Sequence, residues 1–493
     1  MSNSLLTGPR RAGILLHPTS LPGPWDSGVL GSDALRFVEW LQSAGFHLWQ
    51  MLPVGPVGAS GSPYQSVSAF GGNPQLIDPA DFVEAGWLGA DALAAAIARG
   101  GRWQDRQKLL HEAWLGFRRA ANPADRAAFQ QFWQAHRAWL LPMTLFRAAA
   151  VRFGDEGWWT WPDDIRRRQR DAVMALLSDA APVIREIAFE QWVFDRQWQR
   201  LRTHASDCGV ELLGDLPIYV DLDSADVWWH RHFFRVSPDG DPAAVAGVPP
   251  DYFSETGQLW GNPLYDWAAM DKAGYSWWID RVKTQLGRFD WLRIDHFRGL
   301  QAYWEVPAHA SSAREGRWQQ APGAELLKAL SDALAGTPFL AEDLGTITPA
   351  VHALRRQFGL PGMLIAQFAF DGSSDNPYLP ANQIEDAVIY TGTHDNDTVV
   401  GWFNGLDQKS RNYVCKVLAC EPDEIPAALA RSVRESPARV AMFPLQDIFG
   451  LGSEGRMNTP GTASGNWRWR FDWDQMPDML SSTCREQLRN SGR

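Results

Sequence analysis

Short apolar segments, many of them rich in β-branched residues, recur along the chain with helical stretches between them. Eight such segments are strand candidates, at residues 13–18, 46–53, 210–220, 291–297, 339–344, 363–370, 387–395 and 439–449. Strands that are covered on both faces read as near-continuous apolar runs, as these do. Eight buried strands separated by helices predict an α/β fold, the (β/α)8 TIM barrel.

The chain is longer than such a barrel needs. A minimal barrel takes about 250 residues, whereas this chain has 493. The largest expected insertion, 54–207, opens with a Gly/Ser/Pro-rich loop and continues as helix, 221–288 reads as an aromatic loop, and 396–438 looks helical. Without a linker or internal repeat, we expect residues 1–493 to form a single barrel domain with these insertions as subdomains around its cleft.

Composition narrows the class of protein. The chain is 45% hydrophobic and 21% charged, and no apolar run approaches the length of a membrane span. The first eleven residues lack the apolar segment of a signal peptide, so we expect a cytoplasmic protein that does not bind a membrane. With 46 basic and 57 acidic residues the formal charge is -11, which argues against a nucleic-acid partner.

Two residue types add information about ligands. The four cysteines form no Cys-x-x-Cys pair, so we expect reduced thiols with neither a zinc site nor a disulfide framework. The 26 tryptophans are many for this length, and several lie in irregular Gly- and Pro-rich stretches. Most are expected in core packing. An indole face also matches the face of a pyranose ring, so carbohydrate is a candidate ligand.

Acidic residues stand at four of the predicted strand ends. In a (β/α)8 barrel the chemistry takes place at the C-terminal ends of the strands. Any single acid in such a place is as readily explained by capping the next helix as by catalysis. Four on one face, two of them beside an arginine or histidine, are harder to explain by capping. The four acids are Asp215, Asp295, Glu342 and Asp395.

The segment Arg293-Ile294-Asp295 places a cation beside a carboxylate. Alternation along a strand points Arg293 and Asp295 to the same face. Such a pair keeps the carboxylate ionised and aimed, which suits a nucleophile, although one isolated pair is equally a structural ion pair. In the next strand Glu342 and Asp343 point to opposite faces, and burial would raise the pKa of Glu342 toward that of a general acid. Asp343 is expected to cap or brace the following turn.

His394 and Asp395 leave the seventh strand together and can both bind hydroxyl groups. A metal site is the competing interpretation, which we disfavour because metal barrels usually place two or more histidines as ligands, and His17 stands alone on the first strand. No phosphate-binding loop, dinucleotide fingerprint or Gly-x-Ser-x-Gly elbow is present, so no cofactor is expected. An ionised Asp, a protonatable Glu and a third acid are what retaining glycoside chemistry requires.

From residue 13 to about residue 469 the sequence resembles the 4-α-glucanotransferases, also called amylomaltases or disproportionating enzymes, of the α-amylase superfamily. The resemblance is carried by Gly-Ile-Leu-Leu-His-Pro-Thr-Ser-Leu-Pro at 13–22, Ser-Pro-Tyr-Gln-Ser at 62–66, Gly-Asn-Pro at 72–74, Gly-Asp-Leu-Pro-Ile-Tyr-Val at 214–220, Gly-Val-Pro-Pro-Asp-Tyr-Phe-Ser at 247–254, Gly-Gln-Leu-Trp-Gly-Asn-Pro at 257–263, Arg-Ile-Asp-His-Phe-Arg-Gly at 293–299, Ala-Glu-Asp-Leu-Gly at 341–345 and Tyr-Thr-Gly-Thr-His-Asp-Asn-Asp-Thr at 390–398. It also implies that no separate C-terminal β-domain follows the barrel.

The resemblance implies a role for each matching residue. Asp295 would be the nucleophile, Glu342 the acid/base and Asp395 the transition-state stabiliser. The substrate-binding residues would be Arg293, His394, Asp215 and Tyr64 around the donor sugar, Asp251, Tyr252 and Phe253 in a mobile loop, Trp260 on the acceptor side, and His296. The insertion at 91–170 is less familiar than the rest of the chain, so the resemblance does not extend to a second glucan-binding groove there.

These roles imply transfer of an α-1,4-glucan segment to an acceptor glucan through a covalent glucosyl-enzyme. We expect the protein to be a monomer or weak homodimer. A plain α-glucan hydrolase would use the same three acids and remains an alternative. A starch- or glycogen-binding protein that uses its tryptophans as platforms is the non-enzymatic alternative.

Overall fold

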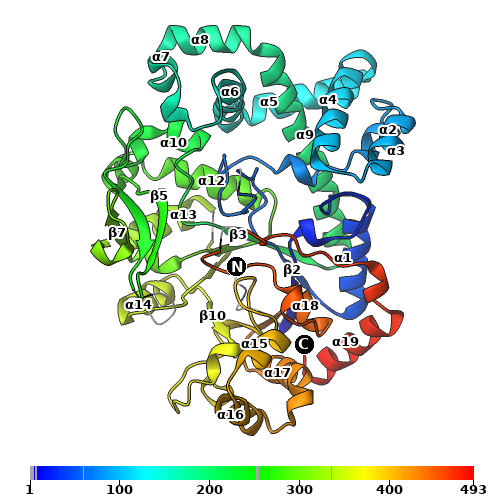
Figure 1. Ribbon diagram of the computed structural model, residues 1–493, viewed down its shortest axis with the longest axis vertical. Helices are drawn as coiled ribbons and strands as arrows, with labels where there is room; N and C mark the ends of the chain where they lie inside the picture. The colour runs from blue at the N-terminus through cyan, green and yellow to red at the C-terminus, as the bar shows by residue number, and fades with distance from the viewer. Residues whose placement is uncertain (1–4, 6–7, 59, 251–254, 335, 463) are drawn as a thin grey trace.

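Eight parallel strands form the centre of the computed structural model, which describes residues 5, 8–58, 60–250, 255–334, 336–462 and 464–493 (Figure 1). The strands are β1 (Arg11–Leu15), β2 (Leu48–Gln50), β3 (Glu211–Leu216), β6 (Trp291–Ile294), β9 (Phe339–Ala341), β10 (Gly362–Ile365), β11 (Ala387–Tyr390) and β12 (Val440–Pro444). Each lies within or overlaps one of the eight predicted segments, so the predicted barrel is confirmed.

The strands follow one another around the barrel in chain order. Their hydrogen-bonded order is β10-β11-β12-β1-β2-β3-β6-β9, and adjacent strands in this order are parallel. The two ends of this order, β9 and β10, meet through a backbone hydrogen bond from Ala341 N to Pro361 O at 2.9 Å. The barrel is therefore nearly closed, and its strand ends share one face.

Both surfaces of the barrel wall are apolar, which explains the continuous apolar runs in the sequence. Alternate residues of the strands belong to two separate clusters of buried side chains. One cluster includes Trp49, Leu292 and Ile389 together with residues of the surrounding helices. The other fills the barrel interior with Leu48, Leu213, Trp291, Leu340, Met363, Ile365, Val388, Tyr390, Val440 and Met442.

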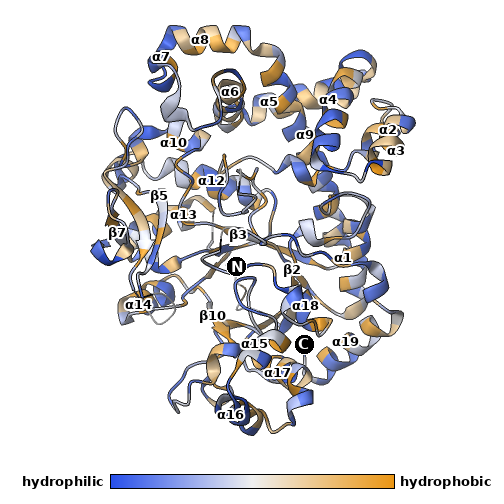
Figure 2. Cartoon of the chain, in the orientation of Figure 1, coloured by the Kyte–Doolittle hydropathy of each residue, from blue (hydrophilic) through white to orange (hydrophobic). Residues whose placement is uncertain are grey.

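Helices cover the outside of the barrel because each has one apolar side. Helix α13, for example, buries Leu326, Leu327 and Leu330, a spacing that places them on one face. Figure 2 shows both hydrophilic and hydrophobic stretches on the outer helices. The helices that follow or flank barrel strands are α1 (Ser32–Ala44), α12 (Ser276–Leu286), α13 (Gly323–Leu334), α14 (Pro349–Gln357), α17 (Ile425–Glu435), α18 (Leu445–Ile448) and α19 (Asp478–Asn490).

The range 54–207 is helical after its opening loop, as predicted. Its helices gather in the upper part of Figure 1, and the last of them, α9, packs against β3 and α1. They are α2 (Ala80–Glu84), α3 (Ala90–Ala98), α4 (Trp103–Ala120), α5 (Pro123–Ala135), α6 (Arg137–Phe153), α7 (Asp163–Arg166), α8 (Arg170–Asp179) and α9 (Ala181–Asp207). The range 396–438 is also helical as predicted, with α15 (Val399–Gly405), α16 (Gln408–Leu418) and α17.

The range 221–288 differs from the aromatic loop that the sequence suggested. It holds α10 (Ala225–Trp229), β4 (Ala244–Val248), β5 (Gln258–Pro263), α11 (Trp267–Lys272) and α12. Strands β4 and β5 join β7 (Ala302–Pro307) and β8 (Arg317–Gln320) in an antiparallel sheet of order β5-β4-β7-β8. The loop interpretation was wrong because β4 pairs directly with β7, although the barrel strand β6 lies between them in the sequence. The local residue pattern around β4 does not reveal such a distant partner.

None of the helices in the described ranges combines the length and the apolar character needed to cross a bilayer.

Candidate functional site

Arg293 joins two acids at the ends of neighbouring barrel strands. Its position in β6 lies beside Asp215 in β3, in register, and Asp295 follows the end of β6. Arg293 Nη1 donates to both carboxylate oxygens of Asp215, at 2.7 and 2.6 Å, and Nη2 donates to Asp295 Oδ1 at 2.8 Å. The Asp215 side chain is fully buried. The predicted pairing of Arg293 with Asp295 is present, and Asp215 belongs to the same cluster.

Several charges act on Asp295. Burial, the largest cause, acts with the carboxylates of Asp215 and Glu342 to raise the pKa of Asp295 well above its usual range, and the Arg293 guanidinium opposes this rise. The Asp295 side chain is still 26% exposed, so a ligand can reach it. The cluster therefore combines one buried cation with several carboxylates at an accessible position.

Glu342 lies one residue beyond β9 and faces this cluster. Its Oε2 accepts a hydrogen bond from His296 N at 2.6 Å, and its Oε1 accepts one from Leu344 N at 3.1 Å. Burial raises the pKa of Glu342 as predicted, while Arg293 and the two backbone N–H groups oppose the rise. The amide bonded to Glu342 belongs to the residue next to Asp295, so the two acids are neighbours.

Asp343 points away from Glu342, as strand alternation predicted. Its contacts differ from the expected cap on the following turn, because Asp343 Oδ1 accepts a hydrogen bond from Met363 N, in β10, at 2.8 Å. Asp343 therefore links two barrel strands.

His296 adopts a left-handed backbone conformation, with φ 49° and ψ 49°. Residues other than glycine rarely adopt it, and such strain often marks a functional turn. The turn directs the His296 amide to Glu342 immediately after Asp295. Trp260, in β5, packs edge-on against the His296 ring, with centroids 4.9 Å apart and planes at 82°.

Asp395 is held by a segment that sequence reasoning missed. Asn458 Nδ2 donates to Asp395 Oδ1 at 2.6 Å, and Arg456 Nη2 donates to the Asp395 carbonyl at 2.8 Å. His394 Nε2 lies 3.4 Å from the same Oδ1, and the Asp395 side chain is 46% exposed. Asn458 lies in an irregular stretch after β12, where no periodicity or motif indicated a partner for Asp395.

Tyr64 connects Asp215 with His394. Its hydroxyl donates to Asp215 Oδ2 at 2.7 Å and lies 2.9 Å from His394 Nε2. Since the single hydroxyl proton serves Asp215, His394 Nε2 is the donor to the Tyr64 oxygen. The Tyr64 and His394 rings stack with centroids 5.4 Å apart, and Trp467 lies 6.0 Å from each ring.

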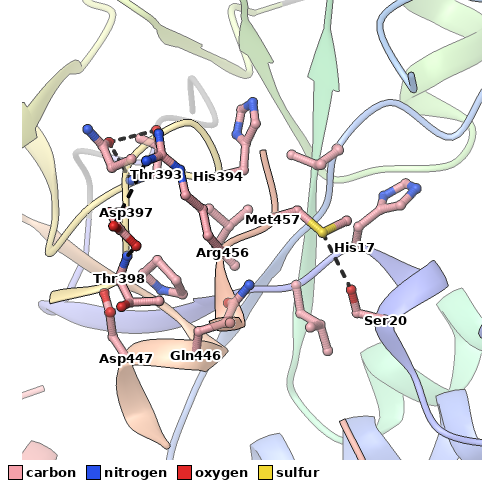
Figure 3. A pocket seen from close by; sticks show the side chains of 16 residues that line it. His17, Ser20, Thr393, His394, Asp397, Thr398, Gln446, Asp447, Arg456 and Met457 are labelled. Atoms are coloured by element: carbon pink, nitrogen blue, oxygen red, sulfur yellow. Dashed lines mark hydrogen bonds and ion pairs between the residues drawn. The ribbon is translucent and has the colours of Figure 1, made fainter. Parts of the chain in front are cut away.

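Two hollows flank the stacked rings. Tyr64 and Asp215 line one of them, together with Tyr219 and Asp221. The other lies at the ends of β1, β11 and β12 and is shown in Figure 3, where His17, Ser20 and Met457 face Thr393, Asp397 and Arg456. The His17 ring is buried, and its Nδ1 has no hydrogen-bond partner among the described atoms.

Asp251, Tyr252 and Phe253 lie outside the described residues. Within the described ranges, no three His, Cys, Asp or Glu side chains are grouped so that they could hold a metal ion. His17 lies near His394, and burial followed by the His394 charge lowers the pKa of His17 to about 3.

Comparisons with known proteins show similarity over nearly the whole chain. A family model described as 4-alpha-glucanotransferase matches residues 16–475. The 4-alpha-glucanotransferase of Thermus thermophilus is 45% identical over 492 residues, 98% of each chain. The chloroplastic/amyloplastic 4-alpha-glucanotransferase of Arabidopsis thaliana is 42% identical and is aligned over 98% of this chain and 86% of its own.

Solved structures extend the comparison to three dimensions. The amylomaltase from Streptococcus agalactiae in complex with acarbose superposes with a TM-score of 0.94 at 33% identity, over 98% of this chain and 99% of that one. The amylomaltase from Corynebacterium glutamicum has a TM-score of 0.78 at 20% identity, over 99% of this chain and 76% of that one, which is a likeness of fold.

Proposed function

The chain belongs to the 4-α-glucanotransferase family and is an enzyme with that activity, and from this premise we propose which residues carry the transfer. Asp295 is the nucleophile, Glu342 the acid/base and Asp395 the stabiliser of the transition state. The substrates are α-1,4-glucans, for which the acarbose complex of the Streptococcus agalactiae enzyme gives support. The observation that carries this assignment is Arg293, which bonds Asp215 and Asp295 beside the half-buried carboxyl of Glu342.

In the first step Asp295 Oδ attacks the anomeric carbon of the donor sugar. Burial raises the pKa of both acids, but Arg293 contacts Asp295 directly and favours its ionised form, so we assign the proton to Glu342. That proton passes to the glycosidic oxygen as its bond to the anomeric carbon breaks. The products are a glucosyl ester on Asp295 and the departing glucan with a free 4-hydroxyl.

In the second step the 4-hydroxyl of an acceptor glucan or glucose attacks the same carbon. Glu342, now ionised, takes the hydroxyl proton while the ester bond to Asp295 breaks. Two inversions at one carbon retain the α configuration. Both acids return to their starting states, so the cycle requires no further reactant.

The remaining polar groups hold the donor sugar. Asp215, Tyr64 and His394 form a hydrogen-bonded line that ends near Asp395, whose Oδ1 lies 3.4 Å from His394 Nε2, and such a line can match successive hydroxyls of a ring. Preorganised partners of this kind stabilise a transition state because they need no reorganisation during the reaction. We assign Trp260, which packs on His296, to the acceptor side.

A reaction with maltotriose tests the proposal. Transfer predicts a ladder of longer maltodextrins together with glucose, and Asp295→Asn is expected to abolish the ladder while the protein remains folded. Glucose and maltose without a ladder would instead indicate the hydrolase alternative. A wild-type protein that binds glucan and releases no product would indicate a binding protein.

We also propose where and in what form the enzyme works. Its four cysteines are free thiols, which supports a reducing compartment and therefore a cytoplasmic location. We propose a monomer or weak homodimer, which light scattering after size-exclusion chromatography measures against the 55.2 kDa of one chain.

A further inference from the structure

The barrel is joined differently between β9 and β10 than elsewhere. Within the described ranges, strand ladders join the other neighbouring barrel strands, but none joins β9 to β10. We call this junction the seam. It contains the backbone hydrogen bond from Ala341 N to Pro361 O at 2.9 Å, which reaches only the residue before β10. Glu342 directly follows β9, so the proposed acid/base stands at the edge of the least regular part of the wall.

Asp343 bridges the seam with its side chain. Its Oδ1 accepts the hydrogen bond from Met363 N in β10 at 2.8 Å, and its Oδ2 lies 3.1 Å from Arg355 Nε in α14. Arg355 in turn donates from Nη1 to Leu360 O at 2.7 Å, just before β10. Asp343 and Arg355 are only 8% and 4% exposed, so this ion pair is weakly screened by solvent.

Because Gly362 has no side chain, the Asp343 carboxylate can occupy the space beside it. A Cβ at Gly362 would lie 2.6 and 2.7 Å from the two carboxylate oxygens of Asp343, distances that real Cβ atoms do not show. The glycine at the start of β10 is therefore matched to the carboxylate at the end of β9. At the seam, Gly362 and Asp343 are therefore in close packing contact.

The bridge adjoins the contacts that orient Glu342. The Leu344 amide, which donates to Glu342 Oε1 at 3.1 Å, belongs to the residue after Asp343. Anchoring Asp343 to β10 and α14 therefore fixes the peptide units on both sides of it. We propose that Asp343 is a positioning residue for Glu342, holding the end of β9 in place across the seam. This inference rests on the proposed acid/base role of Glu342.

The Asp343 charge supplies a second link to Glu342. Arg355 and His352 of α14 face Asp343. Around Glu342 lie Arg293, Asp295, Asp343 and Tyr378. After burial, which is the largest cause, the Asp343 carboxylate also raises the pKa of Glu342. A general acid acts while protonated, so removing this negative charge lowers the pKa of Glu342 and moves the basic limb of the pH–rate profile to lower pH.

The variant Asp343→Asn tests the inference. We expect kcat for maltotriose to fall about tenfold or more, a part of the roughly 10²- to 10⁴-fold that a positioned acid/base contributes. KM should change by less than about twofold because Asp343 does not touch the substrate. The basic limb should move to lower pH. Far-UV circular dichroism and thermal melting establish that the variant is folded.

Asp290→Asn is the matched control. Asp290 Oδ2 accepts a hydrogen bond from Leu212 N at 2.8 Å and Oδ1 pairs with Arg202 Nη2 at 3.0 Å, so it too links two barrel strands. It precedes β6 and therefore lies at the opposite end of the barrel from Glu342. Its loss should leave kcat and the pH profile unchanged. An Asp343→Asn variant that behaves like this control would overturn the inference.

If Asp343→Asn does not fold, Gly362→Ala tests the positioning role of Asp343 instead. It keeps every charge and displaces the carboxylate, so kcat should fall while the basic limb moves less than in Asp343→Asn. An unchanged kcat in folded Gly362→Ala would contradict the positioning role. The wild type and Glu342→Gln separate this inference from the proposed function. A normal wild-type ladder that Glu342→Gln abolishes supports the assigned chemistry, and the Asp343 result then decides the inference alone.

Discussion

At the scale of single residues, the site depends on side chains that serve more than one partner. Arg293 bonds two carboxylates through separate nitrogens, and Tyr64 joins Asp215 to His394. A planar guanidinium can make several directed bonds at once, which a lysine cannot reproduce. Each such residue fixes the relative positions of groups that come from different barrel strands.

Asn458 is expected to position Asp395, and its loss should affect the reaction rate. Asn458→Ala removes the donor at 2.6 Å from Asp395 Oδ1 and should lower kcat for maltotriose by about tenfold, the loss of about 1.4 kcal/mol of transition-state stabilisation. The initial rate of glucose release measures this effect.

Asn466→Ala is the matched control for Asn458. Asn466 lies in the same irregular stretch, where its Oδ1 accepts a hydrogen bond from Thr459 N at 2.9 Å rather than contacting Asp395. Its removal should leave kcat near the wild-type value. Equal losses in both variants would assign the effect to the loop as a whole and contradict a specific role for Asn458.

Sequence reasoning placed some site residues and missed others for a physical reason. Arg293 and Asp295 could be paired because alternation along one strand puts them on the same face. Asn458 reaches Asp395 from 63 residues away in the chain, through a segment without periodicity. The residues around Asn458 and Asp395 in the sequence do not predict this contact, because it depends on the path of the chain after β12.

At the scale of elements, the antiparallel sheet β5-β4-β7-β8 brings an aromatic residue beside the barrel mouth. Trp260 on β5 packs edge-on against His296, next to Asp295. The barrel strands were predictable because each is a continuous apolar run. The second sheet was not predictable, because β4 pairs with β7, which lies beyond the barrel strand β6 in the sequence.

Trp260→Ala should weaken use of the acceptor. Removing the indole takes away a face on which a sugar ring can pack, so the ratio of transfer to hydrolysis should fall several-fold while the first step continues. Chromatography of the maltodextrin ladder, with released glucose and total reducing ends, measures this ratio.

Trp318→Ala provides a control from the same sheet. Trp318 on β8 is also part-exposed, and packs 5.1 Å from Trp304 and under the Arg298 guanidinium. It should leave the transfer ratio unchanged. A wild-type ratio in Trp260→Ala would remove Trp260 from the acceptor side.

At the scale of the whole molecule, we propose that residues 1–493 form one barrel domain whose insertions are subdomains. The helix α9 links the helical insertion to the barrel by packing on β3 and α1, and one main cluster of buried side chains includes residues of both. A shared core favours cooperative unfolding.

Thermal unfolding should therefore follow a single transition. Circular dichroism at 222 nm, which reports mainly the helices, and fluorescence of the 26 tryptophans should give the same midpoint. Two separated midpoints, with the helical range 54–207 melting first, would contradict the single domain.

The central claim is that Asp295 carries the glucosyl group between donor and acceptor. The most direct measurement is mass spectrometry of Glu342→Gln after incubation with α-glucosyl fluoride. Fluoride leaves without help from an acid, and the lost base slows the second step, so the ester should accumulate. We predict one added hexosyl group on the peptide that contains Asp295, and none in the Asp295→Asn/Glu342→Gln double variant. A hexosyl group on another peptide, or its persistence in the double variant, would contradict the account.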